Sequence, residues 1–123
     1  MMRERVFVYG SLMQGLEHHE EMRGAQFEGT CRTVAGFFLA LQGRYPALVR
    51  GGATVVHGES YLVTAAQLAR LDVFEGCPGL YQRERISLDD GGQRFASLID
   101  AERGSRLPRV GSCWRGWVRP SPP

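Results

Sequence analysis

Short apolar runs separated by glycines dominate the hydrophobic pattern of the chain, and they predict a protein built mainly from short β-strands. The first run, residues 6–9, consists of four β-branched or aromatic residues, which indicates a strand buried on both faces. Further strands are expected at residues 34–41, 47–49, 55–63, 81–88 and 95–100. The sequence Asp89-Asp90-Gly91-Gly92 between the last two runs is typical of a hairpin turn.

One segment has a clear helical pattern. Thr64 and Gln67 form a capping-box pattern, and apolar residues then recur along one stripe, which predicts a helix over residues 65–75. Gly76 and Pro78 follow, as is common where helices end. One main helix among several short strands predicts an α+β fold, a small mixed β-barrel that is closed or nearly closed.

Length and composition indicate a single-domain protein and give no sign of nucleic-acid or membrane binding. With 123 residues and no internal repeat or linker, the chain is expected to form a single domain over residues 1–123. A net charge of +2 is too small to indicate binding to nucleic acid or to an anionic membrane, and no apolar run approaches the roughly 20 residues of a membrane span. The pattern leaves the oligomeric state open.

The N-terminus and the cysteines favour a cytoplasmic protein. Residues 1–5 run directly into the first strand, without the apolar stretch and cleavage site of a signal peptide. The three cysteines, Cys31, Cys77 and Cys113, are odd in number and lack CxxC spacing, which favours reduced thiols over a disulfide framework.

The first strand ends at a Gly-Ser pair that is a candidate binding loop. Gly10 allows a sharp turn and a close approach to a ligand, and a turn after a strand leaves backbone N–H groups unpaired. Such groups can hold a carboxylate or an oxyanion. The alternative is an ordinary strand end.

Glu75 occupies an unfavourable position for a carboxylate. It lies in the last turn of the predicted helix, at the negative end of the helix dipole, and it is flanked by Phe74 and Cys77. The dipole and partial burial would both raise its pKa, and a carboxyl group with a raised pKa can exchange protons near neutral pH. The alternative is that Glu75 forms an ion pair with Arg83 or Arg85.

His18 and His19 stand among three glutamates and suggest a metal site at first sight. Adjacent residues of a helix point apart, however, and no pair of histidines has the i, i+4 spacing that shares one ion. A solvated or site-lining segment is expected instead. The sequence also lacks a nucleophile-elbow motif, a P-loop and a dinucleotide fingerprint. Cys77 follows a helix C-terminus, which disfavours a nucleophilic thiolate.

Two stretches resemble the signatures of the γ-glutamylcyclotransferase-like superfamily. VFVYGSL at residues 6–12 resembles its YGSL/YGTL loop, and LDVFEGCPGLYQR at residues 71–83 resembles its LDxFEG and LYxR signature. The form of the second stretch is especially similar to the γ-glutamylamine cyclotransferase branch. Residues 45–49 and 56–59 fit the superfamily as well.

This resemblance implies a fold, an activity and a site. It implies a small β-barrel in which Glu75 is the general acid/base, and in which the loop residues Tyr9, Gly10, Ser11 and Leu12 bind the γ-glutamyl group. Tyr81 matches the motif tyrosine and is a further candidate for substrate contact. The implied reaction releases 5-oxoproline and a free amine from γ-glutamyl-amines or γ-glutamyl-amino acids, with no metal and no cofactor.

Two other functions are also compatible with the sequence. A barrel of this fold could bind small carboxylates or a protein partner without catalysis. A hydrolase that releases glutamate from the same substrates would use the same cavity and would need a positioned water.

Overall fold

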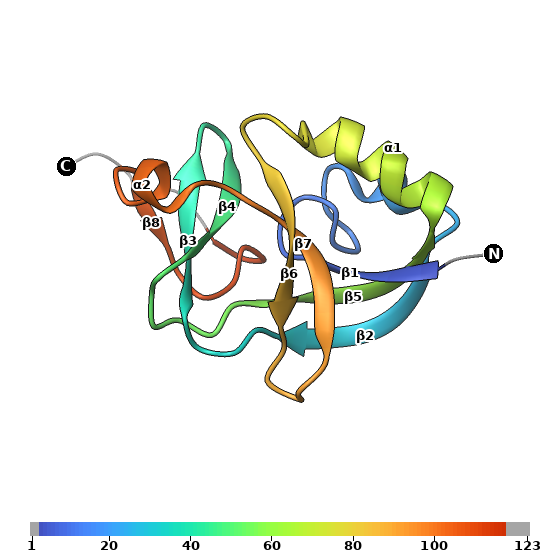
Figure 1. The fold of residues 1–123 in the computed structure, drawn as a ribbon, viewed down its shortest axis with the longest axis horizontal. Helices are drawn as coiled ribbons and strands as arrows, with labels where there is room; N and C mark the ends of the chain where they lie inside the picture. Colours follow the sequence, from blue (N-terminus) through green and yellow to red (C-terminus); the bar gives the residue numbers. More distant parts are fainter. Residues whose placement is uncertain (1–2, 118–123) are drawn as a thin grey trace.

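The computed structural model of the protein describes residues 3–117. Residues 1, 2 and 118–123, which fall within the predicted single domain, lie outside the described residues. The elements in chain order are β1 (Arg3–Val8), the 3₁₀ helix η1 (His19–Met22), β2 (Gln26–Arg32), β3 (Phe37–Gln42), β4 (Tyr45–Arg50), β5 (His57–Thr64), α1 (Ala65–Glu75), β6 (Gln82–Ser87), β7 (Gln93–Leu98), α2 (Ala101–Gly104) and β8 (Arg109–Val110) (Figure 1).

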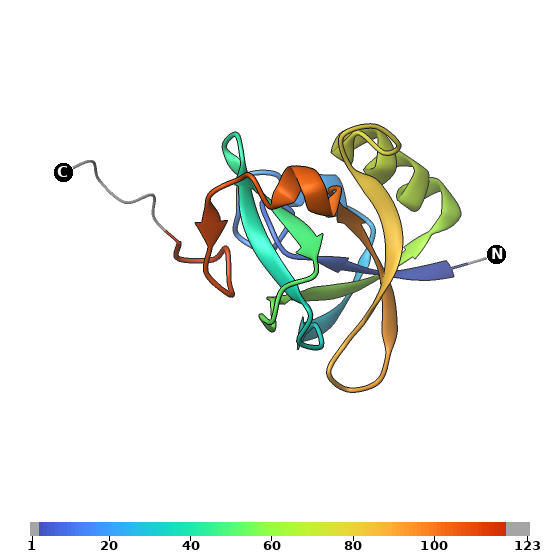
Figure 2. The ribbon, with the colours of Figure 1, turned by 60° about the vertical axis from the view of Figure 1, so that its left-hand side comes forward.

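The strands form one mixed, strongly curled sheet. Its order is β2-β5-β1-β7-β4-β3-β8, and β6 pairs with β7 off this path. β1 is central: it pairs antiparallel with β5 and parallel with β7. An isolated bridge between Thr33 and Leu88 brings the chain beyond β2 against the chain beyond β6, so the sheet nearly closes on itself (Figure 2). The prediction of an α+β fold with a mixed, barrel-like sheet and one main helix is confirmed.

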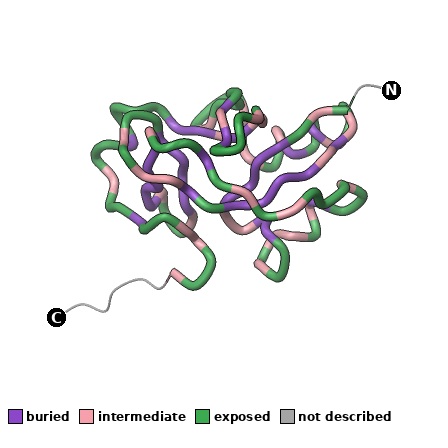
Figure 3. Tube along the Cα trace, turned by 90° about the horizontal axis from the view of Figure 1, so that it is seen from below, coloured by how far each residue is buried: buried purple, intermediate pink, exposed green. Residues whose placement is uncertain are grey.

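The first strand lies between two parts of the core, as its sequence predicts. Phe7 and Tyr9 pack into one cluster with residues of β3, β4 and β7. Val6 and Val8 face the other way, toward a second cluster that includes Leu68 and Leu71 of α1. Figure 3 shows buried segments running along the central strands and exposed ones around the edge.

Local signals set both ends of α1. The Thr64 side chain accepts a hydrogen bond from the Gln67 amide at 3.2 Å, and the Gln67 side chain accepts one from the Thr64 amide at 2.8 Å. Gly76 ends the helix with a φ of 73°, in the left-handed region that glycine tolerates. The predicted helix, 65–75, therefore has the observed bounds.

Several predicted boundaries were wrong by a few residues. The strand expected from residue 34 begins at Phe37, because Gly36 has a φ of 130° and breaks the extended run. The last predicted strand ends at Leu98, since Asp100 instead caps α2 by accepting a hydrogen bond from the Arg103 amide at 3.1 Å. Neither α2 nor β8 was expected from the pattern. Among residues 3–117, no helix has the length and apolar character that a membrane crossing requires.

Candidate active site

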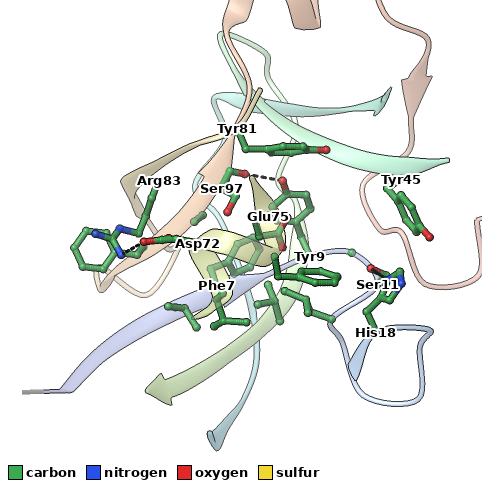
Figure 4. Close-up of a pocket in the computed structure, with 18 of the residues that line it drawn as sticks. Phe7, Tyr9, Ser11, His18, Tyr45, Asp72, Glu75, Tyr81, Arg83 and Ser97 are labelled. Atoms are coloured by element: carbon green, nitrogen blue, oxygen red, sulfur yellow. Dashed lines mark hydrogen bonds and ion pairs between the residues drawn. The ribbon is translucent and has the colours of Figure 1, made fainter. Parts of the chain in front are cut away.

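One cavity of about 210 Å³ lies where the end of β1, the C-terminal end of α1 and the β6–β7 hairpin meet (Figure 4). Its wall contains all six residues that the sequence singled out: Tyr9, Gly10, Ser11, Leu12, Glu75 and Tyr81. Residues from two distant stretches of the chain, 9–12 and 75–81, are thus brought together at one site.

The loop after β1 presents unpaired backbone donors at the cavity wall. Within residues 3–117, the amides of Gly10, Ser11 and Leu12 donate no hydrogen bond, whereas the next amide, that of Met13, donates to the Gly10 carbonyl at 3.1 Å. A Cβ on Gly10 would lie 2.9 Å from Pro46 Cγ, so glycine is required for the loop to pass β4 this closely. Three consecutive free amides can hold an anionic group.

Glu75 lines the cavity without a charged partner. Within residues 3–117, its carboxyl group makes neither a hydrogen bond nor an ion pair. Burial raises its pKa from an ordinary 4.5 to about 7. At neutral pH the group can therefore both accept and return a proton.

The alternative in which Glu75 pairs with an arginine is wrong. Arg83 instead binds Asp72, one turn earlier in α1, with 2.7 Å between Nη1 and Oδ2. The Arg85 guanidinium lies over the Phe95 ring, 4.4 Å from its centre. Both arginines are thus held elsewhere, and the Glu75 carboxyl is left to the cavity.

Tyr9 and Tyr81, the two tyrosines predicted for the site, line the cavity with neutral hydroxyl groups. The Tyr9 hydroxyl donates to the Ser97 carbonyl at 2.6 Å and accepts from the Leu48 amide at 3.1 Å. Burial, followed by the nearby Tyr81 and Glu75, raises the Tyr9 pKa well above its ordinary value. Burial and the proximity of Glu75 raise the pKa of Tyr81 to about 12, and its hydroxyl donates to the Pro46 carbonyl at 3.3 Å.

Sequence reasoning did not single out several lining residues, among them Tyr45, Asp72 and Ser97. The segment around His18 was expected to be solvated or site-lining, and its ring does line the cavity. Tyr45 lies in the stretch 45–49 that fits the superfamily, but its sequence gives no sign of a place at the site. No local signal marks Ser97, because its place in the wall depends on the pairing of β7 with β1 and β6.

The part of the chain from residue 3 to residue 117 contains no group of three His, Cys, Asp or Glu side chains that could hold a metal ion. Cys77 lies beside the site rather than in its wall. Burial raises the pKa of its thiol, and its Sγ donates to Ser97 Oγ at 3.7 Å, which disfavours a thiolate nucleophile.

A family model described as gamma-glutamyl cyclotransferase, AIG2-like, matches residues 6–112. The chain belongs to this family. The superfamily resemblance seen in the sequence is confirmed, and so, at the level of the family, is the expectation of a cyclotransferase enzyme.

Individual relatives agree with the family match. A Vibrio cholerae protein is 40% identical over 109 residues, which are 81% of this chain and 94% of that protein. The gamma-glutamylaminecyclotransferase of Homo sapiens is 39% identical over 87 residues, or 63% of this chain, and the match spans 57% of the human protein's length. The crystal structure of an AIG2-like protein from Mus musculus has a TM-score of 0.81 at 31% identity and covers 91% of this chain and 88% of its own.

Proposed function

We propose that the protein converts γ-glutamyl-amines or γ-glutamyl-amino acids to 5-oxoproline and a free amine, with Glu75 as general acid/base. One observation carries this assignment: a carboxyl group with a pKa of about 7 shares a cavity with three free backbone amides. The family membership supports the same class of reaction.

In the proposed reaction Glu75 transfers protons from the α-nitrogen of the substrate to the leaving nitrogen. Glu75 takes a proton from the α-ammonium group of the substrate, and the freed nitrogen attacks the γ-carbonyl carbon to form a C–N bond. The resulting oxyanion collapses, the bond from the γ-carbon to the leaving nitrogen breaks, and Glu75 returns its proton to that nitrogen. The ring nitrogen then still carries one proton more than a neutral lactam, and the Glu75 carboxylate accepts this second proton and passes it to the departing amine. Because nucleophile and carbonyl belong to one molecule, correct positioning supplies much of the rate enhancement.

The loop amides and the tyrosines have binding roles in this proposal. The N–H groups of Gly10, Ser11 and Leu12 hold the substrate carboxylate or the developing oxyanion. Tyr9 and Tyr81, both neutral, form the sides of the space for the γ-glutamyl chain. Metal ions and cofactors have no part in the proposed steps.

The leaving group then faces the other end of the cavity. In Figure 4, Ser11 lies on one side of Glu75, and the Asp72–Arg83 ion pair lies on the other. If the loop binds the γ-glutamyl group, the leaving amine extends toward this pair of opposite charges. An amine that carries polar or charged groups therefore fits this end better than a purely apolar amine.

The test is product analysis with a substrate panel. The purified protein is incubated with γ-glutamyl-amino acids, γ-glutamyl-amines and ε-(γ-glutamyl)-lysine, and 5-oxoproline and glutamate are measured by mass spectrometry. We expect 5-oxoproline from the wild type and a loss of about 100-fold or more in kcat for Glu75→Gln. The matched control is Glu102→Gln, because Glu102 is an exposed glutamate of α2 that forms an ion pair with Arg106.

Other outcomes would identify the alternatives. Glutamate in place of 5-oxoproline would indicate the hydrolase. A folded protein that binds panel compounds but converts none would indicate the binding protein. The cytoplasmic location, the absence of nucleic-acid or membrane partners and the single domain over residues 1–123 stay predictions.

A further inference from the structure

The adjacent histidines His18 and His19 contact consecutive residues of the candidate binding loop. His18 Nδ1 lies 2.9 Å from Ser11 Oγ, and His19 Nδ1 lies 2.8 Å from the Leu12 carbonyl oxygen. The His18 amide also donates to the Ser11 carbonyl at 2.9 Å. The two rings therefore attach residues 18 and 19, at the start of η1, to residues 11 and 12 of the loop.

The loop needs such attachment from outside. Within residues 3–117, the three amides of residues 10–12 make no hydrogen bond that would fix their direction. Ser11 and Leu12 are held instead through the Ser11 hydroxyl and the two carbonyl groups. Because a peptide group is planar, the bond from Met13 to the Gly10 carbonyl orients the Ser11 amide, and the bond from the His18 amide to the Ser11 carbonyl orients the Leu12 amide. The bond from His19 to the Leu12 carbonyl holds the next peptide plane, at the end of the loop.

His18 also connects the loop to the helix end that carries Glu75. Its ring lies edge-on to Phe74, with 5.1 Å between ring centres, and 5.4 Å from the ring of Tyr45. Phe74 directly precedes Glu75. His19 packs on the other side, 6.1 Å from the Tyr61 ring. The pair thus joins the free amides to the second core cluster and to the general acid/base.

We propose that His18 and His19 are positioning residues that hold the loop of residues 10–12 in the conformation that binds the γ-glutamyl group. This inference rests on the proposed function. The histidines act through Ser11 and Leu12, and His18 also lines the cavity. Their adjacency, which does not suit metal binding, suits the attachment of two consecutive loop residues.

The hydrogen bonds assign a proton to one of the rings. A carbonyl oxygen only accepts, so His19 Nδ1 carries a proton and donates it to Leu12. The Ser11 hydroxyl can donate or accept, so the contact with His18 persists in either tautomer.

Two substitutions at each position separate the hydrogen bond from the ring. Asn offers a polar group near the position of Nδ1, whereas Phe keeps a ring and removes the hydrogen bond. His57→Phe is the matched control, because His57 is exposed at the start of β5 and does not line the cavity. His18→Leu and His19→Leu serve in place of any Phe variant that does not fold.

We expect His18→Phe and His19→Phe each to raise KM about tenfold, because one hydrogen bond that orders the binding loop is lost. Their kcat changes less than about threefold, since binding of the substrate and of the transition state weakens together. His18→Asn and His19→Asn keep KM within about threefold of the wild type. An unchanged KM in both Phe variants, or Asn variants as impaired as the Phe variants, would overturn the proposal.

A second measurement does not depend on catalysis. In ¹H–¹⁵N spectra of the unliganded protein, the amide signals of Gly10, Ser11 and Leu12 should shift or double in the Phe variants and stay near their wild-type positions in the Asn variants. Unchanged signals in the Phe variants would contradict the positioning role. A wild type that makes no 5-oxoproline would contradict the proposed function alone, and the spectra would still decide this inference.

Discussion

The Glu75 carboxyl shows how one residue can be tuned by its place at a helix end. It lies in the last turn of α1, where the helix dipole disfavours a negative charge, and burial raises its pKa to about 7. Arg83 could have reversed this effect by pairing with Glu75, but it binds Asp72 instead. The result is a carboxyl group that is poised between its two protonation states at neutral pH.

The activity should follow the ionisation of Glu75. Only the ionised carboxylate can accept a proton from the substrate, so kcat/KM should rise with pH and level off above an apparent pKa of about 7. A pH–rate profile of the wild type measures this limb. A limb near pH 4.5 would show that Glu75 is not the proton acceptor or is not buried during the reaction.

The same shift predicts a pH-dependent gain in stability for Glu75→Gln. The folded-state pKa lies above the unfolded-state value, so the folded protein binds more protons between pH 4.5 and 7, and wild-type stability falls as pH rises through this window. Gln removes this loss. The variant should be stabilised relative to the wild type by about 2 kcal/mol more at pH 8 than at pH 5.

Urea unfolding of both proteins at the two pH values tests this expectation. Taking the difference between variant and wild type removes the contributions of other titrating groups. A difference in unfolding free energy that is the same at pH 5 and pH 8 would contradict a raised Glu75 pKa.

At the scale of elements, α1 presents Glu75 because its two ends are set by local signals. The capping box at Thr64 and Gln67 begins the helix, and the left-handed Gly76 ends it directly after Glu75. In between, Leu68 and Leu71 pack the helix against β1 and β5. The position of the carboxyl group along the helix is therefore defined to within one residue by the sequence of the helix itself.

Gly76→Ala should loosen this end of the helix. A Cβ at Gly76 meets no atom within 4 Å, so the cost is backbone strain at φ 73°, about 1 kcal/mol of unfolding free energy. Gly111→Ala is the matched control, since Gly111 has equal space and no positive φ. Thermal unfolding of both variants measures the difference. Equal stability of the two would show that the helix end is not strained by a side chain.

At the scale of the molecule, the site depends on strands that are distant in sequence. Tyr9 connects three of them, because it follows β1 and its hydroxyl bonds to Ser97 of β7 and to Leu48 of β4. The cavity lies beside this junction (Figure 4). The Tyr9 hydroxyl therefore joins the strands that curl the sheet and also helps to form the cavity beside them.

Tyr9→Phe should destabilise the fold by about 1–3 kcal/mol, because a half-buried carbonyl and a buried amide each lose a partner. Tyr45→Phe is the matched control, since the Tyr45 hydroxyl meets the exposed Glu17 at 3.2 Å. Urea denaturation compares the two variants. A Tyr9→Phe protein as stable as the control would show that Leu48 and Ser97 find other partners.

Local sequence signals determined much of this protein. The apolar run at residues 6–9 predicted a strand buried on both faces, because its composition excludes a solvent-facing side. The capping box and Gly76 predicted α1 over its full length. The helix dipole and apolar neighbours indicated a raised pKa for Glu75 before any contact was known. Each of these properties depends on residues within a few positions of one another.

Tertiary structure alone decided how these parts meet. The choice of Asp72 over Glu75 as the partner of Arg83, the contacts of the two histidines with Ser11 and Leu12, and the place of Ser97 in the wall all depend on strand pairing across the sheet. Propensity and periodicity act over a few residues and carry no information about which side chains meet across long loops. The sequence therefore determined the candidate groups, and the curled sheet decided which of them share the cavity.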